Sequence, residues 1–449
     1  MQHSLKMKSL TIAFVGALLL TSTWTVASVR PITPTAELGA ALALADQANS
    51  VYLKVNLRGN APEEGVKRTP VNIALVIDKS GSMQGEKIEK AREAAVMAVN
   101  RLSPEDIVSI IVYDTEVSVI VPATRATDKE AIYEAIGRVH AAGNTALFAG
   151  VSKGAAELRK FRSEDRANRI VLLSDGLANV GPSSPAELAE LGTSLATERM
   201  SVSTIGLGLD YNEDLMARLA ESGGGNHIFA ENAVDLARAY DLEFGDLLSV
   251  VAQEVRIRID CPERIRIVRV MGHKGVIDGR RATIAIPQVY ANQDRYIVAE
   301  LEVPAFEAGN HVKVADVEVT CPNADPAIME SRQIVLDISG SAEAVEASIN
   351  PRVMASVSRQ LGTERMLQAQ RLRDAGDIAG SQRLFVENSS QLLTDAERYR
   401  SEQLRKDAQT NRFLGENSST EQEWKRGRKV GIDEATKAQL QGLGYLGNN

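Results

Sequence analysis

Cysteine, histidine and aromatic residues are scarce in this chain of 449 residues. It has two cysteines and five histidines, and aromatic residues make up 4% of it. The histidines show no ligand spacing with cysteine, so a zinc site is not expected. Acidic residues outnumber basic residues by 59 to 51, and a net charge of −8 argues against a nucleic acid partner. Beyond the N-terminal segment no stretch is long and apolar enough to span a membrane, so we expect no transmembrane pore.

The N-terminal residues 1–27 have the pattern of an export signal. Lys6 and Lys8 supply a positive region, and an apolar core runs from Leu10 to Leu20. The small residue Ala27 closes a typical cleavage site. We therefore expect an exported protein, periplasmic or extracellular. An uncleaved segment that anchors the chain to a membrane is the alternative, because the apolar stretch can be read on to Val29.

The two cysteines, Cys261 and Cys321, each follow a predicted strand and each precede a proline. In an exported protein, such a pair in one domain is a candidate disulfide. Two unpaired thiols are the alternative, and the sequence leaves both open.

A run of apolar, largely β-branched residues begins at Val71 and ends at Asp78, and two hydroxyl residues, Ser80 and Ser82, follow at a spacing of two. The run predicts a buried parallel strand, after which a tight loop presents oxygen ligands. Hard oxygen ligands favour Mg²⁺, Mn²⁺ or Ca²⁺ over a soft metal.

The segment Asp78-Lys-Ser80-Gly-Ser82 resembles the Asp-x-Ser-x-Ser signature of von Willebrand factor type A domains. Two later segments are similar to the other loops of that family's metal-ion-dependent adhesion site. Gly143-Asn-Thr145-Ala-Leu resembles the threonine loop, and Arg169-Ile-Val-Leu-Leu-Ser-Asp175-Gly resembles the strand that ends in the second aspartate. The resemblance implies a metal site made of Asp78, Ser80, Ser82, Thr145 and Asp175, with Mg²⁺ as the expected ion and Mn²⁺ or Ca²⁺ as alternatives.

In this family the ion keeps a position open for a glutamate or aspartate of a protein partner. The resemblance therefore implies a binding protein rather than an enzyme, active in adhesion or assembly. It also implies that ligand binding can shift the last helix of the domain, which we expect from Asn232 to Leu248.

Strands and helices alternate over 71–248, which predicts a doubly wound, mostly parallel α/β sheet whose ligands bind at the carboxyl ends of the strands. Residues 249–340 contain only short strands and predict a β-sandwich. A single strand, Val51 to Leu57, lies within the lead-in 28–70 and would make the α/β domain an insertion into the sandwich. Bacterial exported proteins labelled calcium-activated chloride channel homologues look similar from about Val51 to Ser339, although that label is not evidence for conduction.

The C-terminal part divides into two predicted regions. Residues 350–406 have helical apolar stripes and predict a helical appendage, or a single hairpin of the tetratricopeptide kind. Residues 407–449 are predicted to form a polar tail that is mobile from Asp407 to Gly431, with a short amphipathic helix over Thr436 to Leu446 that docks either on the body of the protein or on a partner.

Two other functions compete with metal-dependent binding. The first is a Mg²⁺-dependent phosphohydrolase of the haloacid dehalogenase type, which also ends an apolar strand in an aspartate. That class needs a second acid two residues later, where this chain has Ser80, and a serine cannot exchange protons near neutral pH. The second is a structural scaffold of the cell envelope in which the metal is static.

Overall fold

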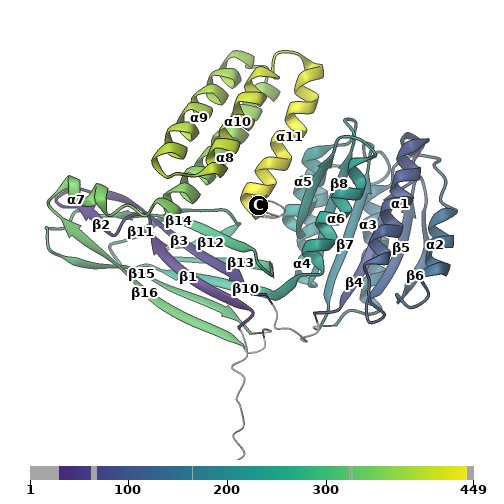
Figure 1. Cartoon of the computed structure of the whole chain (residues 1–449), viewed down its shortest axis with the longest axis horizontal. Coiled ribbons are helices and arrows are strands. Elements are labelled where there is room, and N and C mark those ends of the chain that lie inside the picture. The colour runs from purple at the N-terminus through teal and green to yellow at the C-terminus, as the bar shows by residue number, and fades with distance from the viewer. Residues whose placement is uncertain (1–29, 62–67, 164, 323, 325–326, 442–449) are drawn as a thin grey trace, which may run out of the picture.

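The computed structural model describes residues 30–441 except 62–67, 164, 323 and 325–326. The predicted export signal over residues 1–27 and the predicted helix residues Leu443, Tyr445 and Leu446 lie outside this range. Within it the chain forms an α/β domain, a β-sandwich and a group of helices above them (Figure 1). None of the described helices is long and apolar enough to cross a membrane.

The α/β domain is built on a six-stranded sheet in the order β6-β5-β4-β7-β8-β9. All neighbours are parallel except β6, which pairs antiparallel with β5 at the edge, so the sheet is mostly parallel as predicted. β4, β5, β7 and β8 are buried along their whole length, because helices cover both faces. The strands are β4 (Val71–Asp78), β5 (Ile107–Tyr113), β6 (Val117–Arg125), β7 (Ala167–Ser174), β8 (Met200–Leu207) and β9 (Gly224–Ala230).

Helices on the two faces of this sheet enclose two separate apolar cores. One face is covered by α1 (Glu86–Asn100), α2 (Lys129–Gly137) and α6 (Asp235–Leu247), and the short 3-10 helix η1 (Gly81–Met83) buries Met83 in the same core. The other face is covered by α3 (Leu147–Arg159), α4 (Pro185–Thr197) and α5 (Glu213–Ser222). The doubly wound sheet that the sequence predicted is therefore confirmed.

The β-sandwich combines strands from before and after the α/β domain. One sheet has the order β1-β3-β14-β11 and the other β12-β13-β10-β15-β16-β2. Because β3 precedes the α/β domain and β10 follows it, the domain is inserted into the sandwich, as predicted. The strands are β1 (Ile32–Leu38), β2 (Leu42–Leu44), β3 (Asn49–Gly59), β10 (Val250–Asp260), β11 (Arg266–Met271), β12 (Gly275–Asp278), β13 (Arg281–Tyr290), β14 (Asp294–Val303), β15 (His311–Cys321) and β16 (Ile328–Ser339).

The segment before β3 is more ordered than the lead-in that the sequence predicted. β1 carries Pro34, a residue that argues against a central strand, but β1 lies at the sheet edge, where a proline is tolerated. Its Ile32 and Ala36 face the core of the sandwich. β2 pairs parallel with β16.

The two cysteines are buried and form no disulfide with each other, so of the two alternatives the disulfide is wrong. In the register of β10 against β15, Arg256 lies opposite Thr320 and Asp260 lies opposite Asp316. Cys261 and Cys321 are therefore about six residues apart along the strands, roughly 20 Å at about 3.3 Å per residue. A disulfide needs Cα atoms within about 7 Å.

The C-terminal region is helical up to residue 440, so the mobile segment predicted over residues 407–431 is wrong. The helix predicted from Thr436 agrees with the structure as far as Leu440, where it forms the end of a longer helix. The helices are α7 (Ala342–Ala347), α8 (Pro351–Asp374), α9 (Ile378–Arg398), α10 (Glu402–Glu416) and α11 (Glu421–Leu440). Val353 and Val357 of α8 pack on the sandwich. α11 lies between the other helices and the α/β domain, where it contacts α5 and β9 (Figure 1).

Candidate metal site and its rim

The first candidate ligands lie where β4 ends at the edge of the sheet. The Asp78 carboxylate is fully buried. Its Oδ1 accepts a hydrogen bond from the Ser80 backbone N–H at 2.8 Å, and its Oδ2 accepts one from the Ser174 hydroxyl at 2.7 Å. These two bonds fix the orientation of the carboxylate, and Ser174 is a contact that the sequence did not predict.

The two serine hydroxyls connect this loop to the end of the next strand. Ser80 Oγ lies 3.1 Å from Ser82 Oγ, and Ser82 Oγ donates to Asp175 Oδ1 at 2.6 Å. Asp175 follows β7 and is also fully buried. Because β4 and β7 are parallel neighbours, their carboxyl ends bring the two aspartates to the same edge of the sheet.

The threonine loop approaches the same point from the start of α3. Gly143 has a φ of 76°, which favours glycine, and its carbonyl accepts a bond from the Gly81 N–H at 3.0 Å. The Thr145 N–H donates to Asn179 Oδ1 at 2.8 Å, which holds the loop in place. A Cβ added at Gly176 would lie 3.2 Å from Ser82 Oγ and 3.4 Å from Thr145 Oγ1. The structure thus brings all five predicted residues together.

Lys87 also reaches this cluster, and the sequence analysis missed it. Its ammonium pairs with Asp175 Oδ2. A side chain added at Gly208 would come within 3.9 Å of Lys87 Nζ, so the ammonium lies between Asp175 and the loop after β8. Lys87 is in the first turn of α1, where a positive charge opposes the helix dipole. That unfavourable position is the signal that a closer reading of the sequence would have used.

The two buried aspartates differ in how their charge is compensated. Asp175 has Lys87, whereas the described residues give Asp78 hydrogen-bond donors but no ion-pair partner. Burial raises the pKa of Asp78 to about 6; hydrogen bonds from Ser80 and Ser174 oppose this shift, and the charge of Asp175 adds to it. Two carboxylates and three hydroxyls, with one uncompensated charge, form a donor set that suits a hard divalent cation. No group of three His, Cys, Asp or Glu side chains among the described residues offers a different kind of metal site.

The cluster forms the floor of an open hollow of about 570 Å³, and part of the wall comes from the other end of the chain. Lys425 and Lys429 of α11 line it together with the loop from Leu209 to Glu213. We call Lys425, Arg426, Arg428 and Lys429 the α11 strip. The sequence analysis did not connect this strip with the site, because nearly 250 residues separate it from the metal loops.

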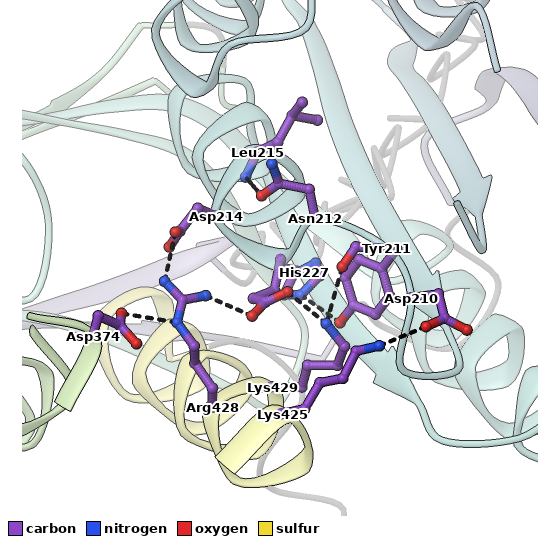
Figure 2. A network of polar contacts seen from close by, with 11 residues as sticks. Asp210, Tyr211, Asn212, Asp214, Leu215, His227, Asp374, Lys425, Arg428 and Lys429 are labelled. Carbon is purple, nitrogen blue, oxygen red and sulfur yellow. Dashed lines mark hydrogen bonds and ion pairs between the residues drawn. The ribbon is translucent and has the colours of Figure 1, made fainter. Parts of the chain in front are cut away.

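The α11 strip is held by acidic residues of the α/β domain and by Asp374 of α8 (Figure 2). Lys425 Nζ lies 2.6 Å from Asp210 Oδ1, and Arg428 lies 2.6 Å from Asp214 and 2.9 Å from Asp374. Glu213 pairs with both Arg428 and Lys429. The other members of the network are the Tyr211 carbonyl, which accepts from Lys429 at 2.9 Å, and Glu231, which lies 2.8 Å from Arg426.

The acidic segment Asp210-Tyr-Asn-Glu-Asp214 superficially resembles a calcium-binding loop. In the structure its acidic side chains instead hold α11 against the α/β domain. Asn212 caps α5 by accepting a hydrogen bond from the Leu215 N–H at 3.1 Å, as expected of helix-start residues. The hydrogen bond from Lys425 lowers the pKa of Asp210, and the charges of Lys87 and Lys429 act in the same direction. Asp210 is thus within electrostatic reach of both the metal site and α11.

His227 lies beneath this rim and is buried. The Thr204 hydroxyl donates to the Met216 carbonyl at 3.1 Å, so it accepts from His227 Nδ1 at 2.9 Å. Nε2 then accepts from the Tyr211 hydroxyl at 3.4 Å. Burial lowers the pKa of His227 to about 3, and Glu213 only partly offsets this. The imidazole is therefore neutral at physiological pH, and because Thr204 and Tyr211 engage both of its ring nitrogens, it is not a candidate metal ligand.

Comparison with known proteins agrees with this fold. Residues 72–241 match the family model of the von Willebrand factor type A domain, so this part of the chain is a domain of that family. Two solved structures share the fold over most of the chain. A von Willebrand factor type A protein from Catenulispora acidiphila covers 85% of this chain and 91% of its own, with a TM-score of 0.68 and 17% identity. The ArnB paralog VWA2 from Sulfolobus acidocaldarius covers 92% and 99%, with a TM-score of 0.61 and 19% identity.

Sequence relatives match over part of the chain. An uncharacterised protein of Synechocystis is 27% identical over 256 residues, which are 55% of this chain and 60% of that protein. Inter-alpha-trypsin inhibitor heavy chain H4 of Homo sapiens is 31% identical over 204 residues, which are 42% of this chain and 22% of that protein. The chain thus spans less than two thirds of these relatives. Type A domains are typically modules of protein interaction or adhesion, are generally not enzymes and often bind a divalent metal.

Proposed function

We propose that the protein is an exported, non-enzymatic binding module that engages a carboxylate of a protein partner through a divalent cation. Asp78, Ser80, Ser82, Thr145 and Asp175 would hold the cation. The observation that carries this proposal is the meeting of three separate loops at the floor of one open hollow, with five oxygen-bearing side chains and a buried Asp78 that has no cationic partner among the described residues.

The charges of these side chains support binding of a partner rather than permanent closure of the site. Two carboxylates balance the charge of one divalent ion, and the three hydroxyls are neutral. The bound ion would therefore supply a Lewis acid that still attracts one more carboxylate. Mg²⁺ is the expected ion, with Mn²⁺ and Ca²⁺ as alternatives.

The residues around the hollow give no support to an enzyme. Its lining contains no histidine or cysteine. The nearby His227 is buried, with both ring nitrogens engaged, so it cannot serve as a general base for a ligand in the hollow. The donor set is thus better suited to binding than to catalysis.

Export is proposed from the N-terminal segment 1–27, read as a cleaved signal. Fractionation of cells that express the full chain, with N-terminal sequencing of the product, tests this. A mature product that begins after Ala27 in the periplasm or medium supports export, whereas an intact N-terminus in the membrane fraction supports the membrane-anchored alternative.

The central experiment is calorimetry with Mg²⁺, Mn²⁺ and Ca²⁺ on wild type, Asp78→Ala and Asp175→Ala. Both variants are expected to lose metal binding, because each removes half of the negative charge that balances the ion. Asp278→Ala, at an exposed position in β12, is the matched control and should bind like wild type. A pull-down from envelope extract with and without chelator then tests partner capture. If the protein still captures its partner in the presence of chelator, and removal of the metal only lowers the melting temperature of the protein, the metal has a static structural role.

A second variant examines the role of Lys87. Its ammonium neutralises Asp175 and so competes with an incoming cation. Lys87→Met should therefore tighten metal binding about tenfold, which corresponds to about 1.4 kcal/mol. Lys90→Met, one turn further along α1 and paired with Glu93, is the control and should leave the affinity unchanged. An unchanged or weaker metal affinity in Lys87→Met would show that Lys87 does not compete with the ion.

A further inference from the structure

The hollow above the candidate metal site is a composite surface. The α/β domain supplies the metal loops, and α11 supplies Lys425 and Lys429 from the far end of the chain. Figure 2 shows both lysines reaching the loop from Asp210 to Glu213. A partner that reaches the metal site therefore meets α11 as well.

The net charge of this surface changes sign when a divalent ion is bound. The hollow is lined by Asp175, Asp210 and Glu213 against Lys425 and Lys429. Including Asp78 below the floor and Lys87 on Asp175 gives four acidic and three basic groups, a net charge of −1. A bound divalent ion changes this to +1. One partner carboxylate on the ion would bring the sum to zero, without using any contact with the lysines.

The two lysines differ in their availability to a partner. Lys429 is buried and is committed to Glu213 and to the Tyr211 carbonyl. Lys425 has 51% of its side chain exposed, and its partner Asp210 has 72%. An exposed pair of this kind is worth at most about 1 kcal/mol, so a partner carboxylate can compete with Asp210 for Lys425. Leu177, which is 59% exposed, adds an apolar contact to the same wall.

We propose that the partner presents an acidic segment with at least two carboxylates, one for the cation and one for Lys425, so that α11 forms part of the binding surface. This inference rests on the metal-dependent function proposed above and adds the chemistry of the partner. Lys425 would then determine specificity between single and multiple acidic groups.

Two fluorescein-labelled peptides of equal length test the inference. One is a glycine-serine peptide with a single glutamate, and the other has four glutamates in the same frame. Fluorescence anisotropy with the full chain and saturating Mg²⁺ should show the four-glutamate peptide binding about tenfold tighter. Lys425→Gln should reduce this difference to about threefold, and Lys425→Glu should remove it.

Two controls separate this effect from general charge and from loss of the metal. Lys406→Gln, at an exposed lysine on α10, should leave the difference unchanged. Calorimetry should give the same Mg²⁺ affinity for Lys425→Gln and wild type. Equal binding of the two peptides to wild type, or an undiminished difference in Lys425→Gln, overturns this inference and leaves the proposed function standing. Failure of both peptides to bind while Mg²⁺ binds overturns both.

Discussion

The type A domain is attached to the rest of the molecule at two places that differ in their exposure to water. At the sandwich, the fully buried Arg169 pairs with Glu243 of its own domain at 2.6 Å and donates across the junction to the Tyr290 hydroxyl at 2.7 Å. At α11, Arg426 and Lys425 keep about half of their side chains exposed and Arg428 keeps 19%, and Lys429 alone of the α11 strip is buried. A buried charge is costly to leave without its partners, whereas an exposed ion pair is screened and weak. The difference indicates a permanent joint at the sandwich and a more easily opened contact at α11.

The largest expected effect is at the buried joint. Arg169→Met would leave Glu243 buried with the Asn226 amide, at 3.0 Å, as its only remaining side-chain partner among the described residues. We expect a loss of about 3–5 kcal/mol in the free energy of unfolding of the α/β domain. Thermal and urea denaturation of the full chain measure it. Arg218→Met, at an exposed position on α5, is the control. A loss below about 1 kcal/mol would contradict the role given to the buried pair.

A smaller loss of stability is expected when the pH is lowered. It arises from His227, which lies between the two attachments. Its pKa of about 3 is below the unfolded value of about 6.5, so only the unfolded chain takes up a proton as the pH falls below about 6.5. The contribution of His227 to the free energy of unfolding is thus constant above about pH 7, and at about pH 5 it is lower by about 2 kcal/mol. Urea denaturation at both pH values measures this.

His227→Gln is the variant for this test, because its amide can donate to Thr204 and accept from Tyr211, yet does not titrate. The variant should lose about 2 kcal/mol less than wild type on acidification. An equal loss in both proteins would show that His227 does not take part in the acid response.

The smallest of these effects is expected at the α11 strip. Arg428→Gln removes contacts with Glu213, Asp214 and Asp374 and should weaken docking of α11 by about 1–2 kcal/mol. Faster hydrogen exchange in α11 would report it, together with a change in Trp424 fluorescence in a Trp24→Phe background, since the chain has two tryptophans. Salt should enhance exchange in wild-type α11 and leave β7 unaffected. Equal salt sensitivity at the two places would remove the distinction between them.

The sequence was sufficient to predict the α/β domain and the meeting of the five candidate ligands. The apolar run from Val71 to Asp78 reflects burial on both faces of a parallel sheet, which is a local property of the chain. Asp175 likewise ends an apolar strand, and parallel strands bring their carboxyl ends together whatever the length of chain between them.

The C-terminal helices could not be predicted in the same way. The buried face of α11 includes Lys429 and Asp433, so its sequence looks polar although the helix is packed on the α/β domain. These charges are stabilised by groups distant in sequence, such as Glu213, and by the Phe229 N–H, which donates to Asp433 at 3.2 Å. The sequence left the pairing of the two cysteines open for a similar reason, because strand register is a tertiary property.

The insertion of the type A domain has a mechanical consequence. Both covalent connections meet at one corner of the sandwich, where the Gly59 N–H donates to the Gln293 carbonyl and the Ala291 N–H donates to the Ser249 carbonyl, each at 2.8 Å. A partner that pulls on the hollow applies its force next to α11, at the carboxyl ends of β4 and β7, whereas the first connection enters the domain at the amino end of β4. Under tension the exposed ionic contacts would yield first, and the domain would swing about that corner with its own sheet intact.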